Sequence, residues 1–191
     1  MQNKTAAAQL LLIFVTFLWG STFLTLQTAL RWADPVVIVA LRFVLASFIV
    51  FCFLRGRINR ITRYEWKAGF VVGCCIFGVY TLQTIGLASI PSSTSAFLTG
   101  LYVGFVPLLQ WLIYKSVPQP VTIATIVLAF TGMTLFANPF SVNLSGQFGE
   151  WVTVLSALIC AAEILSISHF TQGCRPLQLS FTQLITVAVL A

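Results

Sequence analysis

The chain has 191 residues, of which 59% are hydrophobic and only 7% are charged. Ordinary globular chains carry about 25% charged residues, so this composition excludes a soluble domain and indicates that most of the surface faces lipid. The net charge is +6, but the basic residues lie in short segments between apolar runs and form no continuous face. Nucleic-acid binding is therefore not expected.

Apolar runs along the chain are long enough to cross a bilayer, whose core needs about 20 residues of helix. Six such runs lie at 6–30, 36–54, 68–88, 94–114, 121–137 and 150–170. A seventh extends from Leu177 to Ala191. The first run is about twice as long as the apolar region of a cleavable signal peptide, so we expect it to stay in the membrane. Because backbone groups in lipid must be satisfied internally, the runs predict an all-α, polytopic membrane protein.

Basic residues in the connections predict the orientation of the chain. With the N-terminus in the cytoplasm, the outer side holds only Arg31, and the inner side holds Lys4, Arg55, Arg57, Arg60, Arg63, Lys67, Lys115 and Arg175. Cytoplasmic loops are enriched in Lys and Arg, so we predict a cytoplasmic N-terminus.

A faint internal repeat places Pro35 on Pro176, at an offset of 141 residues. One period holds five spans, an odd number, so the second copy would cross the membrane in the opposite direction, as in inverted-repeat transporters. We assign residues 1–140 to the first repeat and 150–191 to the start of the second. Two five-span repeats predict ten helices, so we expect the 191 residues to be a fragment.

Ionisable side chains inside a span cost about 2.5–3.5 kcal/mol each on insertion scales and require an explanation. Arg42 lies about 10 Å into its helix and would either bind an anionic substrate group or extend outward to the interface. Glu163 lies about 20 Å past Glu150, and we expect it to be the only buried carboxylate. It would act as a proton carrier, bind a cationic group, or be a protonated packing residue. His169 is expected at the interface.

Two spans carry polar side chains on one helical face. These stripes are Tyr80, Gln83 and Thr84 on the third span, and Ser95, Thr99, Tyr102 and Gln110 on the fourth. Polar faces of membrane helices turn toward partner helices or a watery cavity, so the stripes predict a substrate pathway or helix packing. Gly-x-x-x-Gly at 69–73 and 100–104 predicts close packing. The repeat offset also places Thr22 on Glu163, so the two halves would present different polar groups.

The five cysteines show no spacing typical of a metal site. Most lie within apolar runs, where Cys behaves as a small hydrophobe. We therefore expect unpaired packing thiols and neither a metal nor a cofactor.

Three stretches resemble the EamA branch of the drug/metabolite transporter superfamily: WGSTF at 19–23, ALRF at 40–43 and TSAFLTGLYVGFVPLL at 94–109. The stretches stand in the right spans and order, and the similarity covers the whole chain. By motif, the positions that match the family are Trp19, Gly20, Arg42 and Pro107. The second repeat departs from the family at residues 160–163, where CAAE, with a carboxylate, stands in place of a Trp-Ala-aromatic stretch.

The resemblance implies two inverted five-helix repeats around a cavity that opens to each side of the bacterial inner membrane in turn. It also implies export of amino acids, small metabolites or toxic compounds. Glu163 makes the proton the candidate coupling ion, and a homodimer is the candidate assembly. The residues that we assign to the substrate pathway are Trp19, Thr22, Arg42, Tyr80, Gln83, Thr84, Thr99, Tyr102 and Glu163.

Most functions other than export lack the sequence features that they require. An intramembrane enzyme would need a Ser–His arrangement or a pair of acids, which the sequence does not offer. A channel would need a ring of charge or a filter-like loop. A non-transporting scaffold stays open, and its polar stripes would be closed helix interfaces in place of an open cavity.

Overall fold

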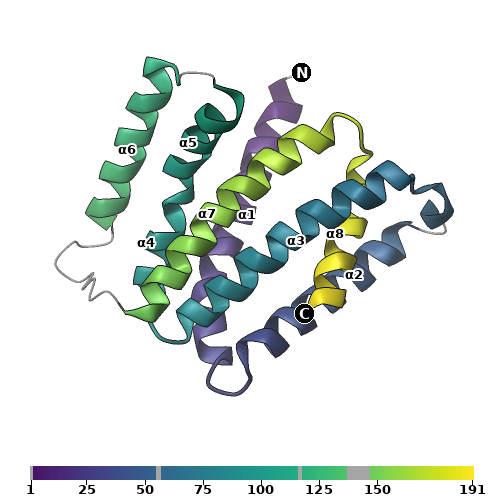
Figure 1. The fold of residues 1–191 in the computed structure, drawn as a ribbon, viewed down its shortest axis with the longest axis horizontal. Helices are drawn as coiled ribbons and strands as arrows, with labels where there is room; N and C mark the ends of the chain where they lie inside the picture. The colour runs from purple at the N-terminus through teal and green to yellow at the C-terminus, as the bar shows by residue number, and fades with distance from the viewer. Residues whose placement is uncertain (1, 55–56, 116–117, 137–146) are drawn as a thin grey trace.

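The computed structural model describes residues 2–54, 57–115, 118–136 and 147–191, and every regular element in these ranges is helical (Figure 1). The helices are α1 (Gln2–Ala29), α2 (Pro35–Leu54), the short 3-10 helix η1 (Arg57–Arg60), α3 (Arg63–Leu87), α4 (Ser92–Gly100), α5 (Tyr102–Tyr114), α6 (Pro120–Phe136), α7 (Phe148–Thr171) and α8 (Pro176–Leu190).

Five segments of the described chain are long and apolar enough to cross a membrane: Ala8–Ala29, Pro35–Leu54, Arg63–Leu87, Ser92–Tyr114 and Phe148–Thr171. The helices predicted at 121–137 and 177–191 are present as shorter apolar helices, α6 and α8. Large apolar side chains are widely exposed, as an outer surface in lipid requires. The predicted polytopic all-α class is therefore confirmed.

The fourth predicted span differs from expectation, because its helix is interrupted at Leu101. The backbone N–H of Leu101 bonds to the carbonyl of Leu98, three residues back instead of four. Gly100, which precedes the break, is a weak helix former. The region 94–114 is thus two helices, α4 and α5, within one segment of membrane-spanning length.

Helix α3 is at the centre of the packing, with α7 and α8 along it (Figure 1). A Cβ at Gly69 would overlap Thr182 of α8, and one at Gly73 would come within 2.6 Å of the Thr186 Cβ. Only glycine at these positions lets the two helices approach so closely, and close packing is a main stabilising contact between helices in lipid. The glycines at 69 and 73 are packing residues, as expected from their spacing.

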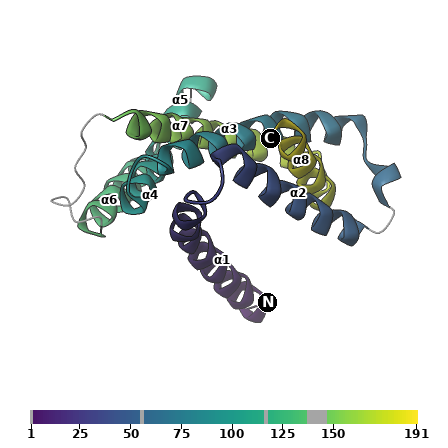
Figure 2. The same cartoon turned by 90° about the horizontal axis from the view of Figure 1, so that it is seen from below.

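Helix α1 projects away from the other helices (Figure 2). Its C-terminal half contacts the bundle through Phe23 and Leu26, which pack against Ile38 and Leu87. Residues 10–15 are exposed. The first span is therefore attached to the bundle at only one end.

One end of the bundle is rich in basic residues. Here α3 and α8 begin and α5 and α7 end, as the contacts of Tyr64 with Phe170 and of Glu65 with Arg175 establish. We call this the basic end, and its charges include those of Arg60, Arg63, Lys67, Lys115 and Arg175.

Candidate functional site

Arg42, Tyr80 and Glu163 form what we call the central cluster, on α2, α3 and α7. The guanidinium carbon of Arg42 lies 5.2 Å from the centroid of the Tyr80 ring, a cation–π contact. The Phe43 ring meets the Tyr80 ring edge-on, with centroids 5.1 Å apart. The Nη1 atom of Arg42 is buried and has no hydrogen-bond partner among the described residues. The guanidinium is thus held inside the bundle instead of extending to the interface.

Glu163 enters the central cluster from α7 and is half-buried. It interacts electrostatically with Tyr80, Cys75 and Cys160. No described residue forms a hydrogen bond or ion pair with its carboxylate. A carboxylate in this setting is stabilised by binding a proton or a cationic group of a ligand.

The expectation that Glu163 is the only buried carboxylate is wrong. Glu65 is 2% exposed and Glu150 is 7% exposed, so both are more buried than Glu163. Each of the two lies in the first turn of a helix, α3 or α7, where free backbone N–H groups favour a carboxylate. The expectation rested on the depth of each carboxylate along its span. Depth does not show how well neighbouring helices cover a side chain at a helix end.

The polar stripes on α3 and α4 contact each other. Gln83 donates from Nε2 to the Thr99 hydroxyl at 3.0 Å, and Thr99 donates to the Ser95 carbonyl at 2.8 Å. Thr84 donates to the Tyr80 carbonyl of its own helix. Gln83, Thr84 and Thr99 are buried. In this conformation they form a closed interface, the arrangement expected for helix packing.

Trp19, Thr22 and Tyr102 lie apart from these contacts. The rings of Trp19 and Tyr102 have centroids 6.4 Å apart, which joins α1 to α5. The hydroxyl of Thr22 donates to the Trp19 carbonyl, one turn back on the same helix. Of the predicted pathway residues, the structure therefore groups Arg42, Tyr80 and Glu163, pairs Gln83 with Thr99, and leaves Thr22 bonded within α1.

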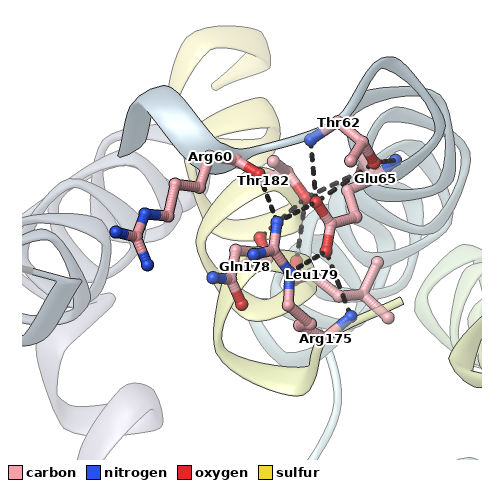
Figure 3. Close-up of polar contacts among 7 residues, drawn as sticks. All are labelled: Arg60, Thr62, Glu65, Arg175, Gln178, Leu179 and Thr182. Carbon is pink, nitrogen blue, oxygen red and sulfur yellow. Dashed lines mark hydrogen bonds and ion pairs between the residues drawn. The ribbon is translucent and has the colours of Figure 1, made fainter. Parts of the chain in front are cut away.

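A second polar cluster, at the basic end, joins α3 to the turn before α8 (Figure 3). The carboxylate of Glu65 accepts hydrogen bonds from Nε and Nη2 of Arg175, each at 3.0 Å, and from the Arg175 backbone N–H at 3.1 Å. It also accepts from the backbone N–H of Thr62 at 2.8 Å, completing a capping box. Nη2 of Arg175 donates to the Arg60 carbonyl. We call this the Glu65–Arg175 clamp.

The clamp was missed by the sequence analysis, which used Arg175 only as an orientation signal. Half of it is visible in the sequence, because Thr62-x-x-Glu65 before an apolar run is the capping-box pattern. The other half is not, since Arg175 lies 110 residues farther along the chain. The hydrogen bond with Glu65 raises the pKa of Arg175.

Comparisons with known proteins agree with this architecture. The model of the EamA-like transporter family matches residues 6–138. An uncharacterized transporter of Archaeoglobus fulgidus is 31% identical over 188 residues, covering 98% of this chain and 58% of the relative. A second uncharacterized transporter of that organism is 28% identical over 157 residues, covering 78% of this chain and 54% of the relative. No solved structure matches the chain.

The chain therefore spans somewhat more than half the length of these two relatives. The family match covers more than half of the chain and includes the regions of α1 to α6, among them Arg42 and Tyr80 of the central cluster. The helical membrane architecture, the family model and the relatives lead to one conclusion. This chain belongs to the EamA-like transporter family.

Proposed function

We propose that the protein is a secondary transporter that exports a small polar metabolite, such as an amino acid, across the inner (plasma) membrane by alternating access. The observation that carries the proposal is the buried Nη1 atom of Arg42, which has no hydrogen-bond partner among the described residues. A buried, unsatisfied donor costs about 1–3 kcal/mol, and more for a charged group. An anionic oxygen of a bound substrate would satisfy it.

Tyr80 and Glu163 complete the proposed site. The Tyr80 ring holds the guanidinium in place, so less conformational entropy is lost when a substrate binds. Glu163 would carry the coupling proton, or would bind a cationic group of the same substrate. Intramembrane acids that lack a fixed partner are typical of proton relays in transporters.

Orientation decides which end of the bundle would take up substrate in the proposed export. We expect the basic end to face the cytoplasm because Lys and Arg are enriched in cytoplasmic loops. Substrate would then load from the basic end and leave at the opposite end.

A non-transporting scaffold is the second candidate. The closed contact between Gln83 and Thr99 favours it, because that part of the polar stripe joins two helices instead of lining a cavity. A scaffold accounts for the contact of Arg42 with Tyr80, which joins α2 to α3. It does not account for the buried Arg42 Nη1 atom, which has no hydrogen-bond partner among the described residues.

Metabolite export by living cells tests the proposal. Media are compared for cells that carry the wild type, Glu163→Gln or an empty vector. We expect a metabolite to accumulate in the medium of cells with the wild type. Its pH-dependent export should be lost in Glu163→Gln, because a neutral amide cannot carry a proton. Glu150→Gln, the same substitution on the same helix, is the matched control and should keep pH-dependent export.

Two outcomes would contradict the proposal in different ways. Unchanged, still pH-dependent export by Glu163→Gln removes the proton-carrier role. Identical media for all strains, with the protein present in the membrane, favour the scaffold.

A further inference from the structure

A cavity of about 440 Å³ lies between α5 and α7 at the basic end, separate from the central cluster. We call it the α5–α7 groove. Its polar lining residues are Gln110, Tyr114, Ser168, His169 and Gln172. His169 was expected at the interface, and it is exposed there.

The polar residues of the groove follow helical spacing on both walls. Gln110 and Tyr114 are four residues apart on α5, as are Ser168 and Gln172 on α7, so each pair lies on one helix face. Leu112, on another face of α5, is 73% exposed and suited to lipid. Polar stripes that face each other across a cavity are not needed for contact with lipid, and they are typical of a water-filled passage.

The groove reaches the depth of the central cluster. Its α7 wall extends from Gln172 to Ile164, about 12 Å of helix at 1.5 Å per residue. Ile164 is the residue after Glu163. The groove therefore connects the basic end to the level at which Glu163 lies.

A neighbouring approach at the basic end is closed. Between α3 and α8, the Glu65–Arg175 clamp covers the end, and Thr182 fills the space beside Gly69. The cavity of about 340 Å³ beside these helices is lined mainly by apolar groups, including Trp66 and Phe70. Of these two described cavities, one between α5 and α7 and one beside α3 and α8, the α5–α7 groove is the one lined mainly by polar side chains.

We propose that the α5–α7 groove is the loading site for substrate at the basic end, and that it binds a small polar molecule with an anionic oxygen group. This inference rests on the proposed export function. The groove offers hydrogen-bond donors from amide, hydroxyl and imidazole groups, and no carboxylate is among its lining residues. Lys115 follows Tyr114 directly, so its positive charge favours an anion at this end of the groove.

Thiol labelling tests the groove without knowledge of the natural substrate. Gln110→Cys and Ser168→Cys are made in a chain whose five native cysteines are replaced, and Leu112→Cys is the matched control on α5. Inside-out and right-side-out vesicles are treated with methanethiosulfonate reagents that carry either a sulfonate or a trimethylammonium group. The labelling rate of each cysteine is divided by the rate at which the same reagent reacts with a free thiol in solution, which removes the difference in intrinsic reactivity between the two reagents.

We expect Gln110→Cys and Ser168→Cys to react in inside-out vesicles, with the sulfonate reagent favoured by roughly threefold or more after this normalisation. Leu112→Cys should stay unlabelled because it faces lipid. Ser168→Cys in the otherwise native chain is a second variant, with the wild type as background, in case the cysteine-free chain does not fold.

Three results would overturn the proposal: equal labelling of Gln110→Cys and Leu112→Cys, preference for the cationic reagent, or reaction only in right-side-out vesicles. The export assay separates this proposal from the proposed function. A labelled groove without export would leave the groove but refute the exporter, whereas export with an unlabelled groove would place the loading site elsewhere.

Discussion

The ring of Tyr80 gives Arg42 a defined position inside the bundle, and this contact leads to a prediction about substrate affinity. A cation–π contact contributes about 0.5–2 kcal/mol, so Tyr80→Leu should weaken apparent substrate affinity by roughly 2- to 30-fold. Tyr80→Phe keeps the aromatic face and should remain within about threefold of the wild type. The measurement is the concentration dependence of export into the medium or into vesicles.

Tyr64→Leu provides the control, because Tyr64 pairs with Phe170 at the basic end, apart from the central cluster. It should leave substrate affinity unchanged. If Tyr80→Phe is as impaired as Tyr80→Leu, the hydroxyl and not the ring determines binding, and the cation–π account is wrong.

At the residue scale the sequence predicted the members of the central cluster but not their contacts. Arg42, Tyr80 and Glu163 stood out because polar groups in apolar spans are costly. Nothing in the sequence indicated that Gln83 bonds to Thr99. A polar stripe on a single helix predicts either a substrate pathway or helix packing, and it does not identify the partner helix. Partner choice depends on how two helices rotate against each other, and no local pattern encodes that rotation.

Among the connections between helices, the Glu65–Arg175 clamp makes a prediction about Cys174, the half-buried residue beside Arg175. Burial and, secondarily, the charge of Glu65 raise the pKa of the Cys174 thiol, so we expect the thiol to react slowly with maleimide in the wild type. Glu65→Gln removes the ion pair and should free the turn before α8. We expect severalfold faster labelling of Cys174 in detergent-solubilised protein.

Two companion variants separate opening of the clamp from a change in charge. Arg175→Gln breaks the same ion pair but keeps the anion, so its effect on the thiol's charge is opposite to that of Glu65→Gln. Faster labelling in both variants therefore reports opening, and faster labelling in Glu65→Gln alone would show an electrostatic effect only. Glu150→Gln, a buried acid in the first turn of α7, should label like the wild type.

At the element scale, hydrophobic run length predicted most of the helices, and their ends were less certain. The break at Leu101 was missed because the run 94–114 is uncharged and hydrophobic enough to predict one span. Gly100, the weak helix former beside the break, was interpreted only as part of a Gly-x-x-x-Gly packing motif. The glycines on α3 were assigned correctly because Gly-x-x-x-Gly has a direct physical reading, close approach of two backbones. Their partner, α8, could not be read from the spacing.

For the molecule as a whole, the described bundle is organised around α3, while α1 is attached at one end only (Figure 2). The sequence predicted the class and the family resemblance, because composition and run length are global properties. It did not predict how α1 is placed, since the run 6–30 carries no charged residue that would distinguish a packing face from a lipid-facing one.

Orientation is a property of the whole molecule, and it decides which side of the membrane the α5–α7 groove faces. Trp32, in the turn between α1 and α2, is 88% exposed, and Arg60 is exposed at the basic end. In intact cells, a membrane-impermeant maleimide should label Trp32→Cys and leave Arg60→Cys unlabelled, because the positive-inside rule predicts that the basic end faces the cytoplasm. Permeabilised cells should label both, which controls for the reactivity of each thiol.

The opposite pattern would place the basic end outside the cell and leave the sites themselves in place. With Arg60→Cys labelled from outside, the α5–α7 groove would face the exterior and would not load substrate from the cytoplasm. The central cluster would bind the same chemistry in both cases, because Arg42, Tyr80 and Glu163 are held by contacts within the bundle that do not depend on which side is the cytoplasm. Accessibility at these two positions therefore decides which side of the membrane the α5–α7 groove faces before any substrate is known.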